Sequence, residues 1–67
     1  MSRYTYRTDA VHSDMEYATE AEAVAAAIAS GDWDEIDSAR EAECIADGAW
    51  LCIFSDGVPS TVRGEMP

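Results

Sequence analysis

Aromatic and polar side chains alternate over residues 3–8, a pattern that is typical of a half-buried β-strand. In such a strand Tyr4 and Tyr6 face the core. Residues 9–18 lack a sustained period and are expected to form a connector, with an extended piece around Met15 and Tyr17.

An Ala-rich segment follows, and both of its ends carry helix signals. Thr19 and Glu22 form a capping box at the start, and Gly31 supplies a left-handed stop. The pattern predicts a helix over 20–30, made of strong helix formers. The apolar face expected for this helix is formed by Val24 and Ile28, with Ala21 and Ala25 beside them.

A second capping box, from Ser38 to Glu41, stands before Gly48 and predicts a helix over 38–47. The alternative is a strand over 40–46 with an Asp-Gly hairpin turn after it. The helix is favoured because both terminal signals agree with the interior residues. The residues at helical spacing are Ala39, Ala42, Ile45 and Ala46, and the preceding loop, 32–37, is expected to be anchored by Trp33 and Ile36.

An apolar run over 49–54, a turn over 55–57 and a short edge strand over 60–63 complete the pattern, with Pro59 limiting the last strand. The order strand, helix, helix, strand, strand predicts an α+β fold. We expect a small antiparallel sheet of about three strands with two helices packed on one face. Residues 1–67 are expected to form one domain.

The length of the chain limits the classes of function that it can perform. A chain of 67 residues buries only a thin core, and a deep substrate cavity would consume apolar volume needed for folding. The start shows no apolar signal region, and no apolar run approaches the ~20 residues that span a bilayer. We therefore expect a non-catalytic, cytoplasmic monomer without membrane contact, in which Cys44 and Cys52 are small buried thiols.

The net charge of −10 is concentrated in the middle of the chain. Residues 14–47 hold eleven acidic residues against Arg40 alone, whereas the acidic and basic residues of the two ends cancel. Like charges that are concentrated in one small domain repel each other and oppose folding. We therefore expect the clustered acidic residues to have a function. A solvated face that maintains solubility is the alternative, and halophilic adaptation is a third reading that the neutral ends do not support.

The usual chemical motifs do not account for the acidic residues. A calcium loop counted from Asp32 places Ile36 and Asp37 where a ligand and a glycine are needed. His12 could pair with a cysteine, but nothing else indicates a nucleophilic site. We therefore expect no catalytic residue, no metal and no cofactor.

A rigid surface that carries carboxylates at the charge density of DNA can occupy a basic nucleic-acid groove. Such a protein does not itself bind nucleic acid. Trp33 in the acidic loop is favoured as a core anchor, and its alternative role is an exposed binding hot spot. The candidate partner-binding residues are Asp32, Asp34, Glu35, Asp37, Glu41 and Glu43, then Glu20 and Glu22 in second rank, together with Trp33.

In size, charge and layout the whole chain resembles the small acidic phage-encoded anti-CRISPR proteins that inhibit type I systems, type I-C among them. The resemblance rests on no signature motif and transfers no residue. It implies an inhibitor that blocks target DNA binding by a type I CRISPR surveillance complex through DNA mimicry, in the bacterial host cytoplasm. The alternative is a non-catalytic interaction module, antitoxin-like or an accessory subunit, whose binding would depend little on salt.

Overall fold

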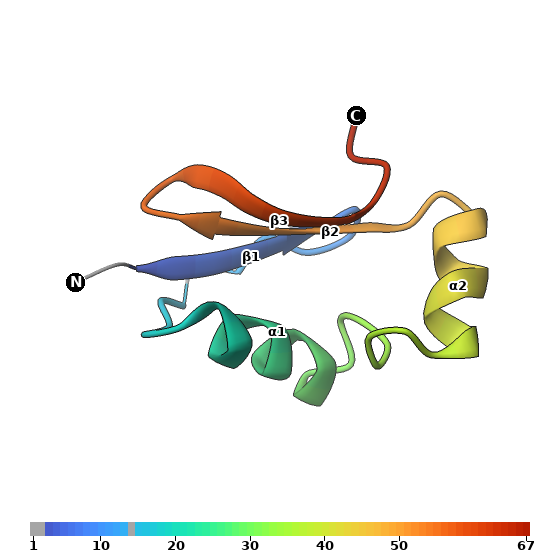
Figure 1. The fold of residues 1–67 in the computed structure, drawn as a ribbon, viewed down its shortest axis with the longest axis horizontal. Coiled ribbons are helices and arrows are strands. Elements are labelled where there is room, and N and C mark those ends of the chain that lie inside the picture. The colour runs from blue at the N-terminus through green and yellow to red at the C-terminus, as the bar shows by residue number, and fades with distance from the viewer. Residues whose placement is uncertain (1–2, 14) are drawn as a thin grey trace.

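The computed structural model describes residues 3–13 and 15–67, so Met1, Ser2 and Asp14, one of the acids counted above, lie outside the described residues. The elements are β1 (Tyr4–Thr8), α1 (Glu20–Ala29), α2 (Ala39–Ala46), β2 (Trp50–Ser55) and β3 (Val58–Gly64). The predicted α+β class is confirmed by a three-stranded antiparallel sheet with two helices (Figure 1). The second helix is present, so the alternative strand over 40–46 is wrong.

The sheet has the order β1-β2-β3, and its central strand is the most apolar segment of the chain. Tyr6 lies opposite Ile53 on one side of β2, and Val62 lies opposite Cys52 on the other. β3 is longer than predicted and includes Pro59, which an edge strand tolerates because its missing N–H costs no interior hydrogen bond. A register shift beside Ile53 absorbs the irregularity.

The connector after β1 turns back along the outer edge of that strand. The Tyr4 N–H donates to the Tyr17 carbonyl (3.0 Å), and the Tyr17 N–H donates to the Tyr4 carbonyl (2.8 Å). Thr8 and Ser13 make further backbone bonds in the same segment. The extended piece expected near Tyr17 is therefore present as an antiparallel bridge, which covers the edge of β1.

Helix α1 begins as its capping box predicts. The Thr19 hydroxyl accepts the Glu22 N–H (3.1 Å), and the Glu22 carboxylate accepts the Ala18 N–H (3.1 Å). Gly31, at φ 78°, follows the last turn. One of the four N–H groups of the helix start, that of Glu22, is thus satisfied without solvent, and so is the N–H of Ala18, the residue before the cap.

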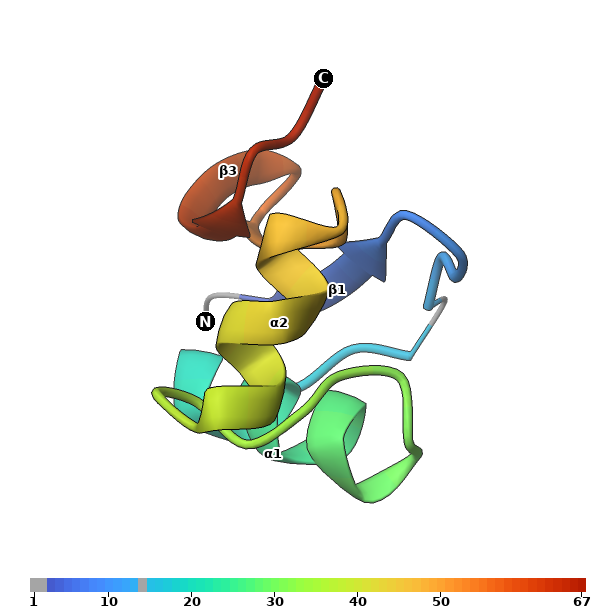
Figure 2. The same cartoon turned by 90° about the vertical axis from the view of Figure 1, so that its right-hand side faces the viewer.

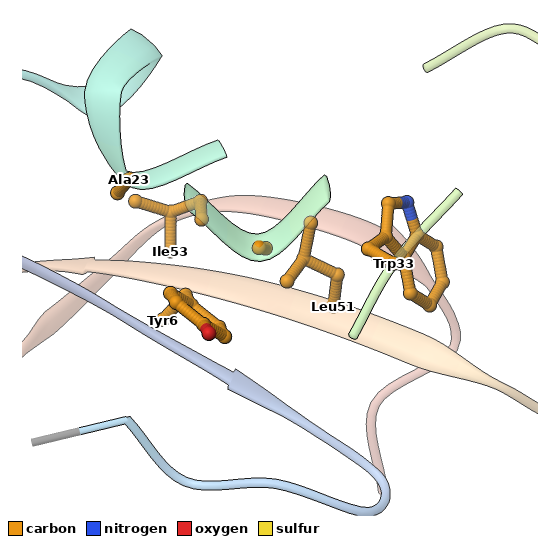
Figure 3. Packing of buried hydrophobic residues seen from close by; sticks show 6 residues of the cluster. Tyr6, Ala23, Trp33, Leu51 and Ile53 are labelled. Carbon is orange, nitrogen blue, oxygen red and sulfur yellow. The ribbon is translucent and has the colours of Figure 1, made fainter. Parts of the chain in front are cut away.

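The buried face of α1 differs from the predicted one. Ala23 and Ala27 are fully buried against Leu51 and Ile53, whereas Val24 and Ile28 are only partly buried and Ala21 and Ala25 are exposed. The small alanine side chains allow the helix backbone to approach β2 closely, so the methyl groups occupy the contact and the longer side chains flank it. Figure 3 shows Leu51 and Ile53 rising from β2 toward this helix, with Tyr6 on the neighbouring strand.

Helix α2 stands upright at the end of the sheet where β2 begins, on the same side as α1 (Figures 1 and 2). The predicted apolar face is wrong for this helix too, because Ala39, Ala42 and Ala46 are exposed. The side that is turned inward carries Ile45 and the buried carboxylate of Glu41. An acidic residue thus occupies the place where the sequence pattern put alanine.

Candidate partner-binding surface

Glu41 is the centre of a buried polar network at the start of α2. Its side chain is 2% exposed. The Trp33 indole N–H donates to Oε2 (2.6 Å), and the Asp37 backbone N–H donates to Oε1 (3.0 Å). One carboxylate therefore joins the interhelical loop to α2. A backbone φ of 63° at Asp37 makes the tight turn between them.

Arg63 of β3 completes this network. Its guanidinium contacts both Glu41 oxygens, and it also pairs with Asp37 at 3.0 Å. The Arg63 hydrogen bond is the main reason that the pKa of Glu41 falls to about 2, and the two carboxylates in turn raise the pKa of Arg63. Both groups therefore stay charged at neutral pH, and their charges cancel locally.

Two of the predicted partner-binding residues consequently lie in the interior. The Glu41 carboxylate is buried and neutralised by Arg63, and Trp33 is 7% exposed and packs in the core. Figure 3 places Trp33 beyond Leu51, at the α2 end of the core. The favoured interpretation of Trp33 as a core anchor is confirmed, and its alternative as an exposed hot spot is wrong.

Two further acids of the loop are tied to the fold but remain partly exposed. Asp32 accepts the Tyr6 hydroxyl (2.6 Å), which raises the pKa of that phenol. Asp34 accepts the Cys44 thiol (3.0 Å), and this contact raises the pKa of the thiol. Arg40, 85% exposed, lies 3.7 Å from Asp34. These contacts fix where the loop carboxylates lie.

The remaining nominated acids of this region are exposed. Glu35 and Glu43 are exposed, and the Asp37 side chain is 83% exposed although it touches Arg63. Asp47, which follows α2 directly, is exposed as well. We call this region the acidic end; its members are Asp32, Asp34, Glu35, Asp37, Glu43 and Asp47. Figures 1 and 2 show the loop and α2 together at one end of the molecule.

The second-rank candidates do not join the acidic end. Glu20 and Glu22 lie in the first turn of the ten-residue helix α1, and the loop follows the opposite end of that helix. A helix of this length spans about 15 Å. Glu20 accepts hydrogen bonds from Ser60 and Thr61, which lower its pKa, and so links α1 to β3.

Sequence reasoning missed Arg63, which decides the role of Glu41. The two residues are 22 positions apart and belong to different elements, so no local spacing relates them. The capping-box pattern correctly placed the Glu41 backbone, since its N–H donates to the Ser38 hydroxyl (3.1 Å). The pattern did not indicate that the Glu41 side chain would point inward, toward Arg63.

The described residues were also compared with the requirements of a metal site, a nucleophilic site and a membrane-spanning helix. Within 3–13 and 15–67, no group of three or more His, Cys, Asp or Glu side chains is arranged to hold a metal ion. His12 is exposed beside β1, and burial raises the pKa of the Cys52 thiol. In the same part of the chain no helix is long and apolar enough to cross a bilayer.

Comparison with protein-family models, with curated proteins and with solved structures found no match to this chain. Interpretation of the acidic end therefore depends on its own geometry and charge.

Proposed function

We propose that this protein is a non-catalytic inhibitor that places its acidic end in the basic site of a nucleic-acid-binding protein and so blocks target DNA. A type I CRISPR surveillance complex is the candidate partner, in line with the resemblance of the chain to small acidic anti-CRISPR proteins. The observation that carries the proposal is the grouping of six partly or fully exposed carboxylates at one end of the molecule.

The local charge balance supports binding to a cationic surface. The charges of Glu41 and Arg63 cancel each other. The acidic end therefore carries six carboxylates, and Arg40 is the one basic residue of positions 32–47. Complementary fields of this kind accelerate encounter with a basic partner and orient the approach.

The way the acids are held also supports recognition of a defined surface. Asp32 is fixed by Tyr6, Asp34 by Cys44, and Asp37 by Arg63. Side chains that are already ordered lose less conformational entropy when a partner binds. A disordered acidic tail would carry the same charge without this advantage.

The test measures how well the protein prevents a purified type I surveillance complex from binding labelled target DNA. We expect inhibition to weaken steeply between about 0.05 M and about 0.3 M salt, because counterions screen and compete with the carboxylates. Inhibition that is insensitive to salt would instead favour the alternative of an ordinary interaction module.

A matched pair of variants tests the surface. Glu35→Lys with Glu43→Lys reverses two exposed charges on the acidic end, and Asp9→Lys with Glu65→Lys makes the same change of net charge elsewhere. We expect the first double variant to lose at least about tenfold in inhibitory potency and the second to lose much less. Equal losses in both would show that total charge, not the acidic end, is responsible, and absence of inhibition by the parent chain would refute this partner.

A further inference from the structure

Helices cover one face of the sheet, yet the central strand is shielded on the other face as well. Side chains alternate along β2, and Leu51 and Ile53 point toward α1. Trp50 and Cys52 therefore point to the opposite side, where Trp50 is only 9% exposed and Cys52 is fully buried. Because both helices lie on the same side of the sheet (Figure 1), other parts of the chain must shield these two side chains.

Arg7 and the residues that follow β3 provide this shield. The Arg7 guanidinium lies 6.0 Å from the centre of the Trp50 ring, a cation–π contact. After β3 the chain rises on the side of the sheet opposite α1 (Figures 1 and 2), and we call residues 65–67 the C-terminal flap. The hollow beside the flap has a volume of about 260 Å³, and its lining residues are Arg7, Trp50, Phe54, Met66 and Pro67.

A glycine sets the direction of the flap. Gly64 is the last residue of β3, pairs with Trp50 and has a φ of 82°. A Cβ at this position would lie 2.5 Å from the Ala49 carbonyl oxygen, closer than such atoms approach each other. Gly57, directly before β3, has a similar φ of 85°, but a Cβ there would meet open space among the described residues. The chain therefore turns into the flap at Gly64 while it is still in contact with the start of β2.

The flap itself is weakly held. Residues 65–67, which the structure describes, belong to no helix or strand, and Pro67 has no N–H to donate. Segments with few backbone hydrogen bonds open with less free energy than the whole domain needs to unfold. We propose that the C-terminal flap is a movable cover that opens about Gly64 while the sheet and both helices stay folded, and that its opening uncovers Trp50 and Cys52.

The closed flap limits the apolar surface of the helix-free face. Val62, opposite Cys52 on β3, is already 45% exposed. An open flap would join Val62, Trp50 and Cys52 into one apolar patch, and large patches of this kind promote association with other proteins. The position of the flap thus controls how much apolar surface this face presents.

Alkylation of the Cys52 thiol by iodoacetamide under native conditions reports the opening. The thiolate is the reactive form, and the buried thiol reacts only when the flap and the Trp50 ring move away. All proteins carry Cys44→Ser, which leaves Cys52 as the single thiol and keeps a hydroxyl that can donate to Asp34. The labelling rate, divided by that of an unstructured cysteine peptide, gives the opening constant. Urea unfolding gives the global unfolding constant for comparison.

We expect the opening constant at Cys52 to exceed the global unfolding constant at least about tenfold. It should change little below about 1 M urea, because flap opening exposes a small surface. Ala27→Leu overfills the contact of α1 with β2, which stays packed when the flap opens. This variant should raise the global unfolding constant at least about fivefold and leave the labelling rate unchanged. Labelling that follows the global unfolding constant in both proteins overturns the proposal.

Two methionines give a matched pair of variants. Met66→Ser removes apolar contact from the flap, whereas Met15→Ser makes the same change at a more exposed site in the connector (65% against 37%). We expect Met66→Ser to raise the labelling rate of Cys52 at least about threefold and Met15→Ser to change it less than about twofold. Equal rates in the two variants would show that the flap does not cover Cys52.

Two glycines test where the flap opens. Gly64→Ala and Gly57→Ala both place a side chain at a positive φ, but only the first adds a clash with Ala49, which opening of the flap relieves. We expect Gly64→Ala to accelerate labelling at least about tenfold and Gly57→Ala to leave it near the parent rate. Similar acceleration by both would place the opening elsewhere. Far-ultraviolet circular dichroism checks that each variant keeps its fold, and labelling needs no partner, so its outcome is independent of the proposed function.

Discussion

The two helices are attached to the same sheet by different physical means. Helix α1 packs through alanines, with Ala23 and Ala27 in direct contact with an apolar strand. Helix α2 is attached through a buried ion pair, in which Glu41 meets Arg63 of β3. The comparison shows that acidic residues of one helix can serve different purposes: Glu41 supports the fold, while Glu43, two residues later, belongs to the surface.

The largest expected effect comes from removing the cation of the ion pair. Arg63→Met leaves the Glu41 carboxylate buried without its partner, which costs about 3–5 kcal/mol in comparable cases. Because a domain of this size commonly has only ~3–5 kcal/mol of stability, we expect the variant to be largely unfolded. Urea unfolding followed by circular dichroism measures the change.

Two controls accompany this variant. Arg40→Met removes an exposed guanidinium (85%) that also pairs with an aspartate, and we expect a loss below about 0.5 kcal/mol. Replacing both Glu41 and Arg63 by Met should recover much of the lost stability, since no charge is then left unpaired. If Arg63→Met is as stable as Arg40→Met, the ion pair does not hold α2 in place.

The elements of this fold could be predicted because their signals are local. Thr19 and Ser38 both accept the N–H three residues later, as their capping boxes require. The buried faces could not be predicted in the same way, since alanine fits either side of a helix. Tertiary packing chose Ala23 and Ala27, which no periodicity distinguishes from Ala21 and Ala25.

The candidate site was predictable only as a region. Counting charges located the acidic loop and α2, and chain continuity keeps most of those residues at one end of the molecule. Counting could not separate Glu41, which turns inward to a guanidinium from a distant strand. It also grouped Glu20 and Glu22 with the others, because their distance along α1 becomes apparent only once the helix is placed.

Acid titration measures what the ion pair of Glu41 contributes to the attachment of α2. The pKa of Glu41 is lowered from 4.5 to about 2 in the folded protein. Its contribution is therefore complete above about pH 4.5 and is lost as the pH falls toward 2, and the shift corresponds to ~3 kcal/mol. We expect the free energy of unfolding, measured by urea at several pH values, to fall through this window.

Glu41→Gln is the control for the titration. It keeps an oxygen that can accept the Trp33 N–H but has no proton to gain, so its loss of stability between pH 4.5 and 2 should be clearly smaller than that of the parent. Parallel curves for the two proteins would show that other carboxylates cause the acid sensitivity. The apolar contact of α1 contributes nothing to this pH dependence.

The smallest of these effects tests the α1 contact itself. Ala27 is fully buried between the helix and β2, so Ala27→Leu forces extra methylene groups into a filled contact and should cost about 1–3 kcal/mol. Ala25→Leu makes the same change on the exposed side of the same helix, where we expect a change within about 0.5 kcal/mol. Urea midpoints of the two variants give the difference directly. If both variants unfold at the parent midpoint, α1 does not lie tightly against β2 and the two helices are not held by different means. If only Ala27→Leu is destabilised and its acid titration stays like that of the parent, the apolar and the ionic attachments act independently.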